Sequence, residues 1–300
     1  MNPRPTTIVD APKLAARLGV DLFLAVETFQ ITGSFKYRAA LEVARSVPHP
    51  ILLTASSGNF GQAIAAAAAA TGKRAVVVMP TTSARVKIDA VRAYGATVDL
   101  VDTTRVPRAE RIRQLADQYP EAYVGSAFDD PHVIRGNSSL GRELAALARP
   151  FDAVVVPLGG GGLTAGTIVG LRAGGHAAAV YGAEPSLAND GARSLAAGHI
   201  VRNESEPPTI ADGARTLALG ERNWAILKDG IAGIVEVSEE RIADGLRALF
   251  ALANLKAEPT GALAVGALLA VPEKFRDRRV CCIVSGGNVD PALYAGLIAS

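Results

Sequence analysis

Four short apolar runs constrain the fold of this chain more than any other feature of its sequence. They lie in the predicted strands 51–55, 74–79 (apolar after Arg74), 153–156 and 280–284, and those at 51–55 and 153–156 are typical of strands that are covered on both faces of a sheet. Helix-like segments separate them along the chain. Strands that alternate with helices at this spacing predict a parallel sheet with right-handed crossovers. We therefore expect an α/β protein built on open, mostly parallel, twisted sheets.

The composition limits the classes of partner. The chain has 300 residues, which suggests about two domains, and 49% of them are hydrophobic. A net charge of +2 gives no strong field for nucleic acid or an anionic membrane. No apolar signal region follows Met1, and the uncharged run 153–171 contains Pro157 and four consecutive glycines, which do not suit a membrane-spanning helix. We therefore expect a cytoplasmic protein whose partners include neither nucleic acid nor membrane.

A lysine stands at the start of an early predicted helix. Thr32, Gly33 and Ser34 form a helix-start signal, in which Gly33 allows strained dihedrals and a hydroxyl of Thr32 or Ser34 can cap the helix. Lys36 then lies in the first turn, where the helix macrodipole disfavours a positive charge and lowers the pKa of the amine. Such an amine is suited to attack a carbonyl carbon. The alternative is an ordinary solvated surface lysine.

A run of glycines follows the strand at 153–156 and precedes a predicted helix. Successive backbone N–H groups at a helix N-terminus favour the binding of a phosphate, and they would come from Gly159, Gly160, Gly161 and Gly162. A flexible turn is the plainer interpretation. A third is a dinucleotide fingerprint, because residues 160–165 read Gly-x-Gly-x-x-Ala and Glu184 ends the next strand where a ribose-binding acid belongs.

Other strand ends also carry polar side chains. Ser56, Ser57 and Asn59 follow the strand at 51–55 and can either hold a carboxylate and a cofactor oxygen or simply cap the next helix. Ser285 follows the last strand in a turn-like stretch. Glu184 and Asp190 form either a solvated acidic pair or two ligands of a hard cation. Open α/β sheets bind ligands at the carboxyl ends of their strands, so these loops together predict a binding site.

The order of these motifs resembles that of the fold-type-II pyridoxal-phosphate enzymes, and within them the serine/threonine dehydratase and serine racemase branch. The segments that carry the resemblance are 32–36, 56–62, 159–162 and 285–288, with further similarity at 128–131, 209–213 and 258–260. The resemblance implies a two-domain, tryptophan synthase β-like architecture, with a small α/β domain at 51–127 and a large cofactor-binding domain at 1–50 plus 128–300. It also implies pyridoxal 5′-phosphate as the cofactor and a homodimer as the assembly.

The resemblance further implies roles for single residues. Lys36 would hold the cofactor as a Schiff base and exchange a proton with the substrate, and Ser57 would be the second catalytic group, on the opposite face. The cofactor would be bound by Phe35, Lys36, Asn59, Gly159, Gly160, Gly161, Gly162 and Ser285. The substrate would be bound by Ser56, Ser57, Arg108 and Thr216. A divalent cation, Mg²⁺ or Ca²⁺, would be bound by Glu184, the carbonyl oxygen of Ala188 and Asp190.

The implied activity is β-elimination from a β-hydroxy amino acid such as L-serine, L-threonine or hydroxyaspartate. A dehydratase (ammonia-lyase) of this kind releases a 2-oxo acid and ammonia. The alternatives are an amino-acid racemase and, from a different class, a non-catalytic regulatory protein that binds a nucleotide or pyridoxal phosphate. The sequence departs from the branch at Phe60, where histidine is usual, and at the expected loop 136–139, where Gly-Asn-Ser-Ser replaces Gly-Gln-Gly-Thr. Phe60 removes a polar contact near the substrate and leaves the identity of the amino acid open.

Overall fold

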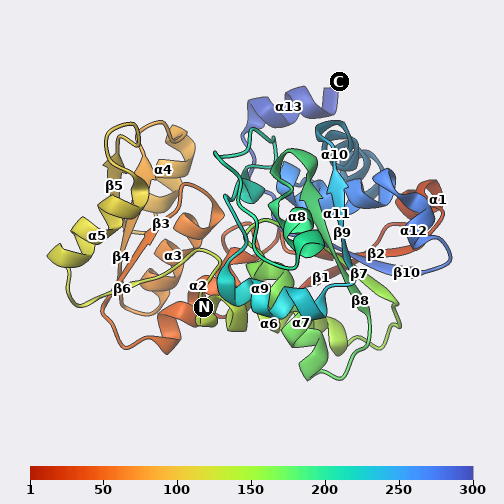
Figure 1. Cartoon of the computed structure of the whole chain (residues 1–300), viewed down its shortest axis with the longest axis horizontal. Helices are drawn as coiled ribbons and strands as arrows, with labels where there is room; N and C mark the ends of the chain where they lie inside the picture. The colour runs from red at the N-terminus through yellow and green to blue at the C-terminus, as the bar shows by residue number, and fades with distance from the viewer. Residues whose placement is uncertain (300) are drawn as a thin grey trace.

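The computed structural model describes residues 1–299, which form two sheets that lie side by side (Figure 1). The larger sheet has the order β1 (Thr7–Asp10), β2 (Asp21–Val26), β10 (Arg279–Val284), β7 (Ala153–Pro157), β8 (Ala179–Pro185) and β9 (Gly233–Val237). The smaller sheet has the order β5 (Thr97–Val101), β4 (Arg74–Pro80), β3 (Ile51–Ala55) and β6 (Ala122–Val124). Each described pairing is parallel except that of β1 with β2. The prediction of an α/β protein with mostly parallel sheets is confirmed.

Helices cover both faces of the larger sheet, which is why its central strands are apolar throughout. On β7, Val155 belongs to one core layer, whereas Val154 and Val156 belong to the other. The first layer is built with α1 (Pro12–Leu18), α10 (Glu239–Ala253) and α11 (Pro259–Ala270). The second is built with α6 (Pro131–Ala145), α7 (Gly162–Ala173) and α9 (Glu221–Gly230).

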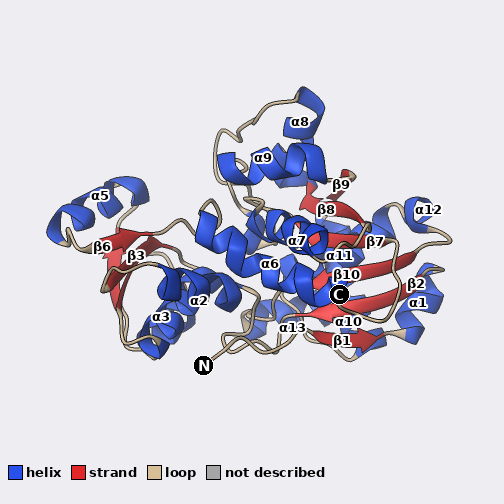
Figure 2. Ribbon diagram, turned by 90° about the horizontal axis from the view of Figure 1, so that it is seen from below, coloured by secondary structure: helices blue, strands red, loops and turns tan. Residues whose placement is uncertain are grey.

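The smaller sheet also has helices on both faces. One face carries α3 (Asn59–Ala70) and α4 (Arg85–Arg92), and the other carries α5 (Arg108–Gln118). The core that contains α3 also contains α2 (Lys36–Ser46) and Val133 of α6. Figure 2 shows α2 and α6 between the two sheets. The core around the smaller sheet thus includes a helix that precedes residue 51, where we expect the small domain to begin, and the domain boundaries stay a prediction.

Shorter elements complete the chain. They are α8 (Asp190–Ala197), α12 (Pro272–Phe275), α13 (Pro291–Ala299) and two 3₁₀ turns at Ser186–Ala188 and Asp212–Ala214. The last helix, α13, lies beside α10 (Figure 1), where the rings of Phe250 and Tyr294 meet edge to face with centroids 6.2 Å apart. Within residues 1–299, no helix combines the length and the apolar character that crossing a membrane requires.

Residues 136–139 lie inside α6, so the prediction of a loop there is wrong. The helix begins after Asp130, whose side chain accepts hydrogen bonds from the backbone N–H groups of His132 and Val133. Glycine at position 136 disfavours a helix by propensity. A Cβ on Gly136, however, would lie 2.6 Å from the carbonyl oxygen of Arg38. The missing side chain allows α6 to pack closely on α2, and this tertiary packing outweighs the local preference.

The fold gathers the predicted loops along one edge of the larger sheet. The strands β2, β10, β7 and β8 are neighbours and run parallel, so their carboxyl ends lie side by side. The lysine turn follows β2, residues 285–288 follow β10, the glycine run follows β7, and Glu184 lies near the end of β8. Segments as far apart in sequence as Thr32 and Asn288, which are separated by 256 residues, therefore meet at the edge where such sheets bind ligands.

Candidate active site

Lys36 is the first residue of α2, as the sequence predicts, and its side chain is half-buried. Its Nζ donates a 2.8 Å hydrogen bond to the carbonyl oxygen of Ala127 and lies 5.0 Å from the ring centroid of Phe35 and 5.7 Å from that of Phe60. Burial lowers the pKa of Lys36 to about 8, although the nearby Glu258 carboxylate raises it. A fraction of this amine is therefore uncharged near neutral pH, as nucleophilic or basic action requires.

The prediction that a hydroxyl of Thr32 or Ser34 caps α2 is wrong. Phe35 occupies the N-cap position, and the hydroxyls of Thr32 and Ser34 are buried with no hydrogen-bond partner in the described part of the chain. The loop after β10 holds this turn instead. Ser34 forms a bridge with Gly286, and the backbone N–H of Phe35 donates to the carbonyl oxygen of Ser285 at 3.0 Å. The lysine turn is therefore fixed by tertiary contacts.

Gly33 has the strained backbone that the sequence predicts. Its φ of +72° lies in the left-handed region, and a Cβ there would lie 2.3 Å from Oδ1 of Asn288. The backbone N–H of Gly287 donates to the carbonyl oxygen of Gly33 at 2.9 Å. Ser285 is 1% exposed, and its hydroxyl has no partner within residues 1–299. A buried hydroxyl without a partner indicates that a ligand atom completes its hydrogen bonding.

The glycine run connects β7 to α7, and its backbone N–H groups are free. Among residues 1–299, no acceptor pairs with the backbone N–H groups of Gly159 through Gly162. A Cβ on Gly160 would lie 2.3 Å from the ring of Phe128, and one on Gly162 would lie 2.7 Å from the carbonyl oxygen of Phe128. Phe128 directly follows Ala127, which accepts the hydrogen bond of Lys36. Ala127 therefore contacts the amine of Lys36, and the next residue, Phe128, packs against the glycine run that carries the free N–H groups.

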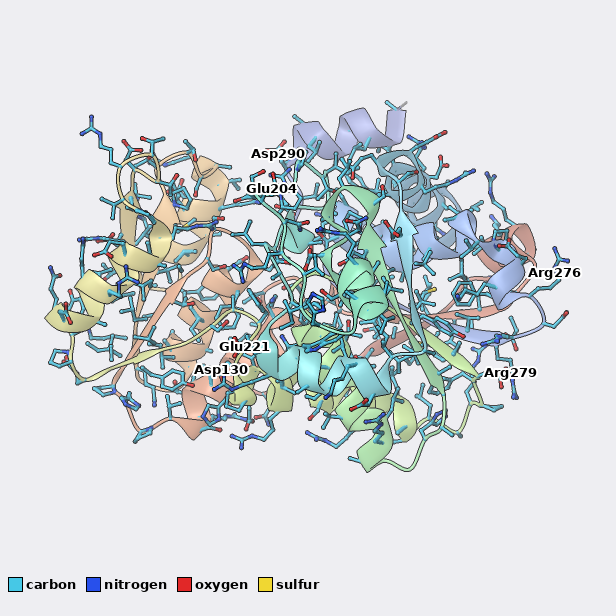
Figure 3. The ribbon with its side chains drawn as sticks, in the orientation of Figure 1. Asp130, Glu204, Glu221, Arg276, Arg279 and Asp290 are labelled. Atoms are coloured by element: carbon cyan, nitrogen blue, oxygen red, sulfur yellow. The ribbon has the colours of Figure 1, made fainter. Side chains whose placement is uncertain are left out.

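The segment 127–130 is itself fixed at the start of two helices. The carboxylate of Asp129 accepts hydrogen bonds from the backbone N–H groups of Glu221 at 3.1 Å and Arg222 at 3.0 Å. Figure 3 labels Glu221, the first residue of α9, beside Asp130, the N-cap of α6. Asn223 donates to the carbonyl oxygens of Phe128 and Gly160 at 3.0 and 2.7 Å. These contacts hold the glycine run rigidly against residues 127–130.

Asn59 begins α3 and directly precedes Phe60, whose ring lies near the Lys36 amine. Its Oδ1 accepts a hydrogen bond from Nδ2 of Asn288 at 2.8 Å, and its Nδ2 donates to Oε1 of Glu258 at 2.8 Å. The hydroxyl of Ser56 accepts a hydrogen bond from the backbone N–H of Gly61, in the first turn of the same helix, at 3.1 Å. Ser57 is half-buried, and its hydroxyl has no assigned partner in the described chain. Both serines thus keep a hydroxyl proton that can be donated to a ligand.

Arg108 and Thr216 lie on opposite sides of the boundary between the sheets. Arg108 is the first residue of α5, and its guanidinium pairs with the carboxylate of Glu206 at 3.3 Å. Thr216 lies in the same segment as Glu206, and its Oγ1 is buried with no partner within residues 1–299. In this conformation the guanidinium of Arg108 is thus paired with an acid rather than free, whereas the hydroxyl of Thr216 is available.

Glu184 and Asp190 form a buried acidic pair at the end of β8. Both oxygens of Glu184 accept backbone N–H groups of α8, from Gly191 at 2.8 Å and Ala192 at 2.9 Å. Burial raises the pKa of Glu184 to about 8, and the charge of Asp190 raises it too. Burial also raises the pKa of Asp190 to about 6, and Oδ2 of Asp190 is unpartnered in the described structure. Glu184 therefore caps α8, and the ribose contact of the dinucleotide interpretation has no support here.

A cation site of three acidic, histidine or cysteine side chains does not occur within residues 1–299. The predicted set contains only two such side chains, Glu184 and Asp190, together with the carbonyl oxygen of the buried Ala188. Two buried carboxyl groups with raised pKa values and one free oxygen are compatible with a hard cation. The assignment of these three residues to a cation site stays a prediction.

Sequence reasoning missed Glu258 as a part of this site. The residue directly precedes α11, is 3% exposed, and accepts the hydrogen bond of Asn59. Burial raises the pKa of Glu258 to about 8, and the charge of Asp212 adds to that effect. Two signals were available: residues 258–260 belong to the segments that carry the family resemblance, and the acid directly precedes an apolar helix that begins with Pro259 and contains no other charge.

These groups fit pyridoxal 5′-phosphate. The fit rests on an amine with a lowered pKa, four free backbone N–H groups at a helix N-terminus, a buried unpartnered hydroxyl, and an amide fixed by hydrogen bonds to Glu258 and Asn288. An anionic phosphate matches free N–H groups at a helix N-terminus. An aldehyde matches the amine.

Comparisons with known proteins agree with this fit. The family described as "Pyridoxal-phosphate dependent enzyme" matches residues 1–286. The chain is 37% identical over 297 residues to L-threo-3-hydroxyaspartate ammonia-lyase of Pseudomonas sp., covering 98% of this chain and 92% of the relative. It is 34% identical over 298 residues to serine racemase of Schizosaccharomyces pombe, covering 98% and 92%.

Solved structures show the same fold. The threonine deaminase of T.th. superposes with a TM-score of 0.91 and 40% identity, covering 96% of this chain and 94% of that one. Maize serine racemase superposes with a TM-score of 0.93 and 28% identity, covering 99% and 92%. The architecture is that of the fold-type-II enzymes of this kind. The chain therefore belongs to the pyridoxal-phosphate-dependent enzyme family, and pyridoxal 5′-phosphate is its cofactor.

Proposed function

We propose that this protein is a dehydratase (ammonia-lyase) that eliminates the β-hydroxyl group of a β-hydroxy amino acid and yields a 2-oxo acid and ammonia. The observation that carries the proposal is the position of Lys36, whose lowered-pKa amine lies beside the segment that holds the glycine run. Relatives named L-threo-3-hydroxyaspartate ammonia-lyase support it, as does a relative named beta-hydroxyaspartate dehydratase from Paracoccus denitrificans.

The cofactor would be held by the chain at four points. Lys36 would bind its aldehyde carbon, and the free N–H groups of Gly159, Gly160, Gly161 and Gly162 would bind its phosphate. Ser285 would face the pyridine nitrogen, Asn59 would donate to the ring oxygen, and Phe35 would lie against the ring. When bound, pyridoxal phosphate supplies an electron sink for the bond that breaks at the substrate Cα.

The protein groups would then move the protons. The uncharged amine of Lys36 would take the proton from the substrate Cα and could pass it to the hydroxyl that leaves Cβ as water. Ser285 would offer a neutral hydroxyl, rather than a carboxylic acid, to the pyridine nitrogen. A second water would be consumed in the release of ammonia and the 2-oxo acid.

The substrate would bind between the two sheets. Ser56 and Ser57 before α3 and Thr216 across the boundary would bind its polar groups, and Arg108 would contribute after release from Glu206. The cation site at Glu184, Ala188 and Asp190 would hold Mg²⁺ or Ca²⁺. Movement of the small domain, residues 51–127, toward the large domain would exclude water from the site.

We also propose amino-acid racemisation as the second candidate activity. The half-buried hydroxyl of Ser57, which has no assigned partner within residues 1–299, could return a proton to the opposite face of Cα. Relatives named serine racemase support this activity. We further propose a cytoplasmic homodimer; the buried, free cysteines Cys281 and Cys282 are consistent with a reducing compartment.

The test is a 2-oxo acid assay across L-serine, L-threonine and the stereoisomers of 3-hydroxyaspartate, with chiral analysis of the recovered substrate. We expect 2-oxo acid from at least one of these, and none from Lys36→Ala, which should also lack the visible absorption of the lysine-bound cofactor. Inversion without 2-oxo acid would favour the racemase. A yellow protein that changes none of these compounds would favour a cofactor-binding regulatory protein.

A further inference from the structure

Three side chains from distant parts of the chain, Glu258, Asn59 and Asn288, form a hydrogen-bonded row. The Nδ2 of Asn288 donates to Oδ1 of Asn59 at 2.8 Å and to the carbonyl oxygen of Thr32 at 2.7 Å. The Nδ2 of Asn59 donates to Oε1 of Glu258 at 2.8 Å. Both protons of the Asn288 amide are therefore used, whereas one proton of the Asn59 amide remains free.

The row selects one orientation of the Asn59 amide. Turning that amide over would place its nitrogen against the donor nitrogen of Asn288, and no hydrogen bond can form between two donors. It would also remove the N–H that Oε1 of Glu258 accepts. Because Glu258 is almost completely buried, water cannot easily replace the lost partner. Glu258 and Asn288 together keep the nitrogen of Asn59 as the donor.

Glu258 is itself held in place. Its backbone N–H donates to the carbonyl oxygen of Gly286 at 3.0 Å, and a Cβ on Gly286 would lie 2.6 Å from Oε1 of Glu258. The loop that carries Ser285 therefore leaves room for this carboxylate and fixes its backbone.

The charged groups around Glu258 come from three elements. Lys36 lies on α2, Lys87 on α4 and Asp212 in the 3₁₀ turn at 212–214. The charge of Asp212 raises the pKa of Glu258, whereas those of Lys87 and Lys36 lower it. Lys87 and Asp212 form an ion pair with each other at 2.5 Å. The amine of Lys36 donates to a backbone carbonyl oxygen rather than to a carboxylate, and Glu258 is the acid whose charge acts on it.

We propose that Glu258, together with Asn288, positions Asn59 for the cofactor. It fixes the Asn59 amide with one N–H left to donate to the cofactor ring oxygen. This role rests on the proposed function, because it assumes that Asn59 contacts the cofactor. It goes further in assigning the orientation of Asn59 to a residue outside the predicted set.

Three variants test the role. Glu258→Gln keeps the size and an acceptor for Asn59, whereas Glu258→Ala and Asn288→Ala each remove a contact that fixes the amide. The matched control is Glu239→Gln, a half-buried acid that accepts the backbone N–H of Ile210 instead. The measurement is the Kd of pyridoxal phosphate for the cofactor-free protein.

We expect Glu258→Gln to keep the Kd within about threefold of the wild type, because it retains an acceptor for the Asn59 amide. We expect Asn288→Ala and Glu258→Ala to raise the Kd about tenfold or more, because the Asn59 amide is no longer fixed. Glu239→Gln should leave the Kd unchanged.

An unchanged Kd in both Asn288→Ala and Glu258→Ala would overturn the inference, as would a Kd of Glu258→Gln as weak as that of Glu258→Ala. Each variant is first checked for a cooperative thermal transition, and Asn288→Ala and Glu258→Gln keep the test decisive if Glu258→Ala does not fold. A wild-type protein that binds no pyridoxal phosphate would refute the proposed function itself. Wild-type binding and turnover with variants that match it would refute only the role of Glu258.

Discussion

The guanidinium of Arg38 meets the carboxylate of Glu27 at 2.7 Å, with side chains that are 1% and 0% exposed. Arg38 also donates to Glu143 on α6 at 2.7 Å and to Oγ1 of Thr6 at 2.9 Å. Because Arg38 lies two residues after Lys36, this network fixes the first turn of α2 against β2, α6 and the N-terminal segment. The position of the reactive amine thus depends on a buried ion pair that does not touch the ligand.

Replacing Arg38 with methionine should destabilise the protein strongly. The change leaves Glu27 buried without its partner, and breaking a buried pair in this way costs about 3–5 kcal/mol. Arg135→Met is the control, because its pair with Glu42 is more exposed and should contribute about 1 kcal/mol or less. Urea unfolding of the cofactor-free proteins measures both values. Equal losses in the two variants would contradict a special role for the Arg38 network.

The pH dependence of Lys36 gives a second prediction. Burial lowers the pKa of this amine to about 8, so the uncharged form appears about two pH units below an ordinary lysine. In cofactor-free protein we expect amine labelling at Lys36 to rise through pH 8, while exposed lysines react only at higher pH. Mass spectrometry of a pH series resolves the sites. A rise near pH 10 would show that the amine is solvated.

The strands were predictable because each central run is apolar on both faces. β3 begins and ends where the sequence predicts, and β7 and β10 differ by one residue at an end. The edge strand β1 was not predicted, because only its two central residues, Ile8 and Val9, are partly buried and the run is short. The start of α6 was missed because glycine at position 136 locally disfavours a helix. The close approach of Gly136 to Arg38 is a contact between residues far apart in sequence, so the local pattern does not reveal it.

The ligand-facing residues were predictable for a similar local reason. Lys36, Asn59, the glycine run and Ser285 each follow a strand directly or begin a helix, so their places follow from the order of elements. Their partners were not predictable, because Glu258 is 199 residues from Asn59 and Ala127 is 91 residues from Lys36. Nothing local to Glu258 or Ala127 specifies those contacts, which arise only when the two sheets come together.

The glycine run gives a third prediction. A methyl group on Gly160 would lie 2.3 Å from the ring of Phe128, so Gly160→Ala must displace Phe128, at a cost of about 1–3 kcal/mol for overpacking. We expect a lower Tm and at least tenfold weaker binding of pyridoxal phosphate, because Phe128 follows the residue that holds Lys36. Gly296→Ala on α13, where a Cβ meets nothing within 4 Å, is the control. Unchanged binding in Gly160→Ala would argue against the glycine run as the phosphate site.

The buried acids give the last prediction, which concerns stability and pH. Burial raises the pKa of Glu184 to about 8 and that of Asp190 to about 6, above their ordinary values. The folded protein therefore holds protons that the unfolded chain has lost, so this contribution to stability is fully present below about pH 4 and is lost as the pH rises toward 8. A bound divalent cation would take the place of those protons.

We accordingly expect Mg²⁺ or Ca²⁺ to raise the Tm relative to a chelator, and to raise it more at pH 8 than at pH 6, because fewer protons compete for the carboxylates at the higher pH. Asp190→Asn should abolish the difference between the two pH values, since it removes the carboxylate that has a free oxygen. Glu240→Gln, which changes an exposed acid on α10, should leave it intact. The same increase at both pH values, or an undiminished increase in Asp190→Asn, would place the cation elsewhere on the protein.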